Sequence, residues 1–373
     1  MPDAIRPCDL SAASLPTPRG PISTEVVEQL ARPADSGTWP IAVGGADPYG
    51  EDVQLALAVL YELHYRGFAE VDAAWEWAPG PLGLRAELER LFLSRLRADV
   101  PAGDDPDAVF EGLCREPRDA WGVSHELAER GTWSQMREFF VHRSIYHLKE
   151  ADPHALAIPR LSGRAKAALV AVEFDEYGGG RADRMHSRLY ADLLTAAGLR
   201  EDYLGYLDAV PAVTLATVNF MSLCGLHRAH TPMLVGMFTA AEITTAPSAR
   251  RMAKALERLG AEQACITFYT EHIEADAVHE QVLRHDVVGD LVARDPACAT
   301  DIVFGAEAAE FLEGRLAGHL LGNWSSGTTS LRAPVAAVGQ PVGCPTGGRD
   351  PGTFQSSTPG SWVEVPPAPR IRR

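Results

Sequence analysis

Three potential metal ligands stand close together in the segment TEHIEADAVHE, where His272, Asp276 and His279 occupy positions i, i+4 and i+7. If the segment is an α-helix of about 3.6 residues per turn, all three side chains leave the same face. Burying two imidazoles and a carboxylate together is costly without a partner, and a divalent transition metal such as iron suits these donors. The surrounding residues are apolar, so this face is expected to point into the protein. The alternative is a solvated polar face with scattered histidines.

A second group of candidate ligands lies in the segment EFDEYGGGRADRMH. Asp183 and His186 form a D-x-x-H pair like the one in TEHIEADAVHE, and Glu176 precedes Asp183 by seven residues, nearly on the same helical face. The three glycines at 178–180 cost a helix roughly 1 kcal/mol each relative to alanine, which is understandable if the backbone must bend there. The alternative is a loop between two ordinary helices with a surface carboxylate.

Two further glutamates qualify by their surroundings. Glu242 is the only charged residue between Met233 and Thr245, and a lone buried glutamate needs a cation or a raised pKa. Glu150 ends an amphipathic segment, where an exposed glutamate is the ordinary interpretation.

Together the candidate ligands would balance the charge of two metal ions. Four carboxylates would neutralise two Fe(II) ions if the histidines stay neutral, which is the electrostatic condition for a buried dimetal site. The carboxylates would be Glu150, Glu176, Glu242 and Asp276, and the histidines His186, His272 and His279. Adding Asp183 would leave the site negative, so Asp183 is predicted to lie beside the ligands and to bind metal only occasionally.

The elements that must position these residues are predicted to be helices. Apolar residues recur at three- and four-residue spacing, and no sustained period-2 alternation indicates strands. The predicted helices cover 23–30, 51–68, 79–100, 133–152, 163–179, 182–198, 212–226, 232–244, 249–260, 262–287 and 306–324, with prolines, Pro247 among them, near their boundaries. The fold class is therefore all-α. We divide the chain into a partly irregular N-terminal arm (1–45), an N-terminal helical extension packed on the core (46–130), a helical core (131–325) and a flexible Pro/Gly/Ser-rich tail (326–373).

Composition restricts the class of protein. A net charge of −16 with a pI near 5.2 repels nucleic acid and anionic membranes, so neither is an expected partner. No signal peptide and no membrane-spanning apolar run are apparent, and six cysteines are spread singly without CxxC spacing. We expect a soluble, cytoplasmic protein with reduced thiols.

The segments KEADPHALAIPRLSGRAKAALVAVEFDEYGGGRADRMH, AAEITT and TEHIEADAVHE together resemble the haem-oxygenase-like diiron oxidases, the iron-containing redox enzyme family. The resemblance extends from about Trp133 to Trp324. It implies a compact haem-oxygenase-like bundle of seven helices around a dimetal site. The ligand pattern of the family falls on Glu150, Glu176, His186, Glu242, His272, Asp276 and His279. In relatives with an N-terminal helical extension that part helps to form a dimer, so a homodimer is expected.

The resemblance also implies an activity, that of an O2-activating non-haem diiron oxygenase with two iron ions and O2 as co-substrate. In such enzymes two Fe(II) ions and O2 give a peroxo-diiron(III) species that attacks a small-molecule substrate. The outcomes implied are N-oxygenation of an amine or amino acid, desaturation or C–C cleavage, and oxidative decarboxylation. We favour N-oxygenation, with an external reductant if more than one O2 is consumed. His227 and Arg228 could bind a substrate carboxylate, although such residues more often cap a helix C-terminus.

Other classes of protein remain open at this stage. One alternative is a metal-free helical binding protein on the same scaffold. Relatives of this fold include metal-free oxidases and thiamin-degrading hydrolases, and Cys224 is the candidate nucleophile of a hydrolase. Ferritin-type diiron proteins use E-x-x-H pairs, which the D-x-x-H pairs here do not match well. A haem protein would need one proximal histidine beside an apolar slot, whereas carboxylates surround the histidines of this chain.

Overall fold

The computed structural model describes residues 13–34, 39, 41–117 and 120–333, apart from the side chains of residues 274–277. Within these residues the regular structure is helical, and the β-structure amounts to a single bridge between Ala13 and Phe68. The α-helices are α1 (Pro21–Leu30), α2 (Glu51–Glu62), α3 (Pro79–Asp99), α4 (Pro106–Leu113), α5 (Val123–Glu129), α6 (Trp133–His147), α7 (Asp152–Ala155), α8 (Gly163–Glu176), α9 (His186–Ala196), α10 (Ala212–Leu226), α11 (Thr231–Leu259), α12 (Gln263–Val282), α13 (Gly289–Arg294) and α14 (Ala299–Ser325). The predicted all-α class is confirmed.

Short helical segments connect these elements. Single 3-10 turns lie at Ala73–Trp77, Ile158–Arg160, Gly178–Gly180, Ala182–Arg184, Arg228–His230 and Pro296–Cys298, and a π-helical segment (Leu283–Val288) joins α12 to α13. None of the helices in the described part of the chain is both long and apolar enough to cross a bilayer.

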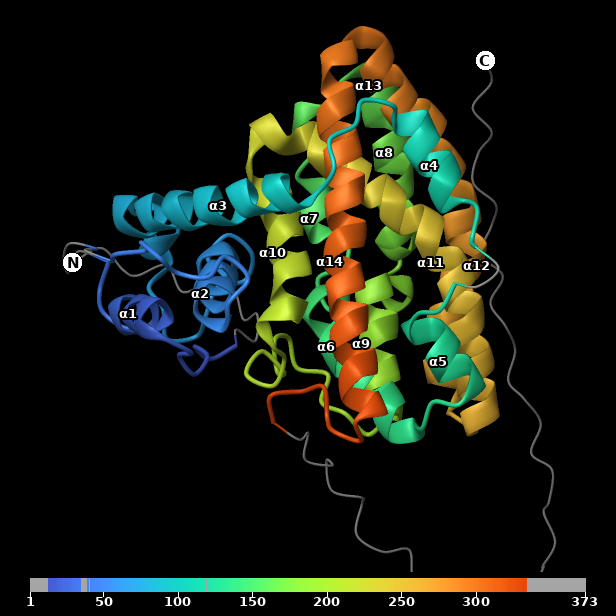
Figure 1. Cartoon of the computed structure of the whole chain (residues 1–373), viewed down its shortest axis with the longest axis horizontal. Coiled ribbons are helices and arrows are strands. Elements are labelled where there is room, and N and C mark those ends of the chain that lie inside the picture. Colours follow the sequence, from blue (N-terminus) through green and yellow to red (C-terminus); the bar gives the residue numbers. More distant parts are fainter. Residues whose placement is uncertain (1–12, 35–38, 40, 118–119, 334–373) are drawn as a thin grey trace, which may run out of the picture. The chain divides into compact units, whose positions relative to one another are not determined.

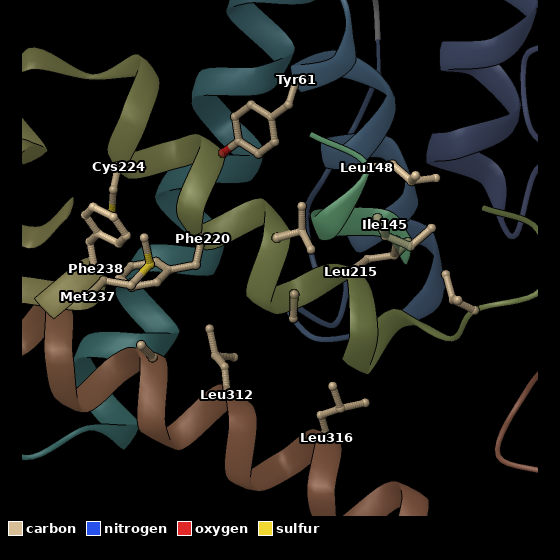
Figure 2. Packing of buried hydrophobic residues seen from close by; sticks show 14 of the residues in the cluster. Tyr61, Ile145, Leu148, Leu215, Phe220, Cys224, Met237, Phe238, Leu312 and Leu316 are labelled. Atoms are coloured by element: carbon tan, nitrogen blue, oxygen red, sulfur yellow. The ribbon is translucent and has the colours of Figure 1, made fainter. Parts of the chain in front are cut away.

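The core of the fold is built around α11, which packs against α10, α12 and α14. Figure 1 shows α14, in orange to red, beside α10 and α11. Phe220 of α10, Met237 of α11 and Leu312 of α14 are among the buried side chains that meet between these helices, as Figure 2 shows. Helix α9 packs against α12. The helices that carry candidate ligands are thus packed against one another by apolar side chains.

Two glycines allow α11 and α14 to cross closely. A β-carbon on Gly236 would lie well inside contact distance of the Ile302 carbonyl oxygen. A β-carbon on Gly305 would lie equally close to the Met233 carbonyl oxygen. Because each neighbour is backbone, neither can move aside without shifting a helix.

Replacing Gly236 by alanine is therefore expected to destabilise the protein by at least about 2 kcal/mol through overpacking. Chemical denaturation would measure the change. Gly314→Ala, on the neighbouring helix α14 but with open space around it, is the control and is expected to raise stability slightly, by about 1 kcal/mol at most. Equal stability of the two variants would contradict the close crossing.

The predicted helix boundary at Pro247 is wrong, since α11 runs continuously from Thr231 to Leu259 with this proline inside it. Proline removes one backbone donor from a helix. Hydroxyl groups next to it bond to the helix's own carbonyls, with Thr244 Oγ1 3.1 Å from the Ala240 oxygen and Thr245 Oγ1 2.7 Å from the Ala241 oxygen. Packing against α12 and α14 outweighs the local preference to end the helix.

The N-terminal residues pack on the core in two places. Helix α2 lies against α10, where the Asn219 side chain donates to the carbonyl and the side-chain oxygen of Gln54, each at 2.8 Å. Helices α4 and α5 instead pack on α11 and α14. After α14 the chain continues with buried Ser330 and Leu331. The rest of the predicted tail, residues 334–373, lies outside the described residues, as do residues 1–12 of the predicted arm.

Candidate metal centre

Six buried side chains form two groups, each with the composition of a metal site. In each group three nitrogen or carboxylate oxygen atoms lie within 4.8 Å of one another. The first group is Glu150, His186 and His272; the second is Glu176, Glu242 and His279. No member is more than 8% exposed. Imidazole and carboxylate donors in this mixture suit Fe(II) and similar divalent ions.

The first group is held by three different elements. Glu150 lies in the turn after α6, His186 begins α9, and His272 is on α12. His272 Nε2 lies 3.6 Å from Glu150 Oε1, and the ring centres of His186 and His272 are 4.3 Å apart. His272 Nδ1 lies 2.7 Å from the Phe268 carbonyl oxygen, so its N–H donates there and the Nε2 lone pair is on the side of Glu150. This is the tautomer that a histidine ligand needs.

The second group is joined to the first through Glu176. Its Oε2 atom lies 2.7 Å from His186 Nδ1, and its Oε1 atom lies 3.4 Å from His279 Nδ1. His279 Nδ1 is also 3.1 Å from Glu242 Oε2 on α11. The two oxygens of Glu176 therefore reach toward different groups, which is the arrangement that a carboxylate bridging two metal ions requires.

The backbone around Glu176 explains how α8 and α9 bring their ends together. Helix α8 stops at Glu176, and Gly178, Gly179 and Gly180 follow with φ of 71°, 63° and 82°. Positive φ angles of this kind are accessible to glycine at little cost. The predicted bend at these glycines is confirmed, and it returns the chain so that His186 faces Glu176.

Two of these carboxyl groups are held in the ionised form. Burial by itself raises the pKa of Glu150, but opposing effects, the charge and hydrogen bond of His147 first among them, outweigh it and hold that pKa well below the usual range. Burial likewise opposes ionisation of Glu176, and the charge and hydrogen bond of His186 lower its pKa overall. Charged carboxylates are the form that binds a metal cation.

Not every predicted site residue joins the two groups. Asp183 is exposed and its carboxylate accepts a hydrogen bond of 2.9 Å from Arg181. The side chain of Asp276 lies outside the described residues. His227 Nε2 lies 2.9 Å from Glu89 Oε2 of α3, while Arg228 is exposed. The substrate-binding role of these last two residues stays a prediction.

Sequence reasoning overlooked two polar side chains next to the ligands, His147 and Glu173. Each precedes a candidate ligand by three residues, a spacing that puts both side chains on one helical face and could have revealed them. His147 Nδ1 lies 2.8 Å from Glu150 Oε1, where its N–H fixes the orientation of the carboxylate. Glu173 is only 2% exposed, and neither of its carboxylate oxygens has a hydrogen-bond partner among the described residues.

The Glu173 side chain leads to a testable pH dependence. Burial, together with the nearby charges of Glu176, Glu242 and Asp152, raises its pKa to about 9. Between pH 4.5 and about pH 9, Glu173 therefore keeps its proton in the folded protein but loses it in the unfolded chain. As a result, Glu173 lowers the stability of the fold as the pH rises through this range.

Glu173→Gln should consequently stabilise the metal-free protein, with an advantage that grows from pH 5 to pH 9 by up to about 1.4 kcal/mol per pH unit. Urea denaturation of both proteins at several pH values would measure it. An advantage that does not change with pH would show that Glu173 is ionised in the fold.

Comparisons with known proteins show which family part of this chain is similar to. Residues 137–314, just under half of the chain, match the model of the family described as iron-containing redox enzyme. All six members of the two groups fall inside this segment. A nitrosourea synthase from Streptomyces achromogenes subsp. streptozoticus is 28% identical over 161 residues, which are 43% of this chain and 34% of that relative. The chain thus spans only about a third of the length of this relative.

Proposed function

We propose that this protein is a non-haem diiron oxygenase that uses O2 to oxidise a small amine or amino-acid-derived substrate. Residues 137–314 belong to the iron-containing redox enzymes, and the all-α fold is the haem-oxygenase-like fold that the sequence predicts. The observation that carries the proposal is the pair of buried histidine and carboxylate groups that meet at Glu176. A lone iron site would need only one of these groups, and a haem site would need neither.

The residues of the chain would hold the two ions in a dry and nearly neutral site. Glu150, Glu176 and Glu242 contribute three negative charges, and the proposal takes Asp276 as the fourth. Since the six described ligands are at most 8% exposed, bulk water has little access to the ions. When bound, two Fe(II) ions would supply the binding site for O2 and the electrons for its reduction.

N-oxygenation is the reaction we favour. The support comes from the relative named nitrosourea synthase, because a nitrosourea carries a nitrogen-bound nitroso group. Desaturation, C–C cleavage and oxidative decarboxylation are the other reactions that the same ligands could serve. Each would leave a different product from one amine.

Stopped-flow absorbance would test the proposal. Anaerobic protein loaded with two equivalents of Fe(II) is mixed with O2 and a panel of amines and amino acids. A transient visible band that forms faster with one compound, followed by an oxygenated nitrogen in that product by mass spectrometry, is the expected result. A carbon–carbon double bond or a lost carboxyl group would replace N-oxygenation by desaturation or decarboxylation. Absence of both iron binding and the band would overturn the diiron proposal in favour of a metal-free binding protein.

The hydrolase alternative is less compatible with the structure. Cys224 on α10 is fully buried among apolar side chains, near Phe238 in Figure 2. Burial raises the pKa of its thiol well above the ordinary value, so the nucleophilic thiolate is disfavoured.

A further inference from the structure

Glu150 differs from the other five members of the two groups because its backbone belongs to no helix. It lies in the turn between α6 and α7, whereas the others are on α8, α9, α11 and α12. The next residue, Ala151, has φ of 75°, a conformation that residues other than glycine seldom adopt. Backbone bonds run along the turn, with Lys149 N 2.8 Å and Glu150 N 3.4 Å from carbonyl oxygens of α6, and Asp152 N 3.2 Å from the Lys149 oxygen. Side-chain contacts add to these bonds and connect the turn, with the carboxylate it carries, to a second element.

These contacts come from the C-terminal end of α2 and the residues after it. Lys149 Nζ lies 3.2 Å from Glu62 Oε2 and 4.3 Å from the centre of the Tyr65 ring. One residue earlier, the Leu148 carbonyl oxygen accepts a hydrogen bond of 3.3 Å from Arg66. Both residues immediately before Glu150 are thus tied to the segment 62–66.

Glu62 is itself fixed on several sides. The Tyr203 hydroxyl lies 2.9 Å from each of its carboxylate oxygens, and the Arg66 backbone N–H donates to Oε1 at 3.1 Å. The Arg66 guanidinium group in turn lies 4.1 Å from the centre of the Tyr203 ring. With side-chain exposures of 2% for Glu62 and 5% for Lys149, the ion pair is almost fully buried.

A buried ion pair contributes little net stability to a fold. Removing two charges from water costs several kcal/mol per ion, and apolar residues of similar volume are often equally good or better. What such a pair does supply is a defined geometry between the two elements it joins. Here those elements are α2 and the turn that carries Glu150.

We propose that Glu62 and Lys149 are positioning residues, whose ion pair sets the place of the Glu150 carboxylate beside His186 and His272. Residues 51–66 would then tune the affinity of one metal ion of the two, in addition to covering α10. The inference rests on the proposed function, since it takes Glu150 as a metal ligand.

The test uses the full-length double variant Glu62→Gln/Lys149→Met, because either single change leaves an unpaired buried charge and endangers folding. Glutamine still accepts from the Tyr203 hydroxyl, and methionine fills the space of the lysine stem. Anaerobic calorimetric titration with Fe(II) is expected to show one ion bound about 10- to 100-fold more weakly, as for other residues that orient ligands, and the other ion bound as in the parent. Amide hydrogen exchange of metal-free protein is expected to rise around residues 148–152.

The matched control is Arg143→Met/Glu313→Gln, which removes another ion pair of α6, with N–O distances of 2.9 and 2.5 Å to α14. It should leave both iron affinities and the exchange of the turn unchanged. Parent-like binding of both ions by the Glu62/Lys149 variant, or an equal loss at both ions, would overturn the positioning role while leaving the diiron proposal intact. A parent protein that binds no iron would instead overturn the proposed function and the ligand role of Glu150 with it.

Discussion

Replacing His279 by alanine is expected to lower the iron affinity of the group Glu176, Glu242 and His279 by at least about 100-fold. Residues that merely orient a ligand already cost 10- to 100-fold when removed, and His279 supplies the only nitrogen donor of its group. The variant should retain at most one iron per chain and lose the reaction that needs two. Its helix content should persist, because α12 is held by packing against α9 and α11. Equilibrium dialysis, stopped-flow absorbance and circular dichroism would measure the three quantities.

His285→Ala is the matched control. His285 lies in the π-helical segment that continues α12, but its side chain is exposed and belongs to neither group. Its removal should leave iron binding and O2 consumption unchanged. A His279→Ala protein that still binds two irons with parental affinity would show that this histidine is a packing residue.

Replacing His272 by alanine is expected to weaken the other ion, that of the group Glu150, His186 and His272, to a similar extent. Glu150→Ala should have a milder effect on the same ion, because both imidazole ligands stay in place and the carboxylate of Glu176 remains 2.7 Å from His186. Titrating each variant with Fe(II) under anaerobic conditions would give the two affinities. If His272→Ala, His279→Ala and Glu150→Ala all reacted with O2 like the parent, the assignment of the site would be wrong.

The order and spacing of residues were enough to predict helices and candidate ligands, because both follow from local periodicity. His272 and His279 share a face of α12, as the spacing requires. The structure nevertheless assigns them to different groups. Seven residues of helix rise about 10 Å along the axis, too far for both imidazoles to bind one ion. The same separation along the helix is the one expected if each histidine binds its own ion.

What local spacing could not predict depends on contacts between distant segments. The continuity of α11 through Pro247 depends on neighbouring helices. Glu62 and Lys149 are separated by 87 residues, and neither lies in a recognisable motif. Glu173 looks like an ordinary helical glutamate in the sequence, whereas the structure buries it with no hydrogen-bond partner among the described residues. Each of these features belongs to tertiary packing, about which a single sequence says little.

The most direct test of the central claim is the number of Fe(II) ions bound per chain. Metal-free protein would be titrated anaerobically with Fe(II), and bound iron would be counted after equilibrium dialysis for the parent, His272→Ala and His279→Ala. Two ions for the parent and one for each variant is the result that two groups sharing Glu176 predict. A parent that binds one ion or none, or variants that bind as many ions as the parent, would contradict the dimetal site.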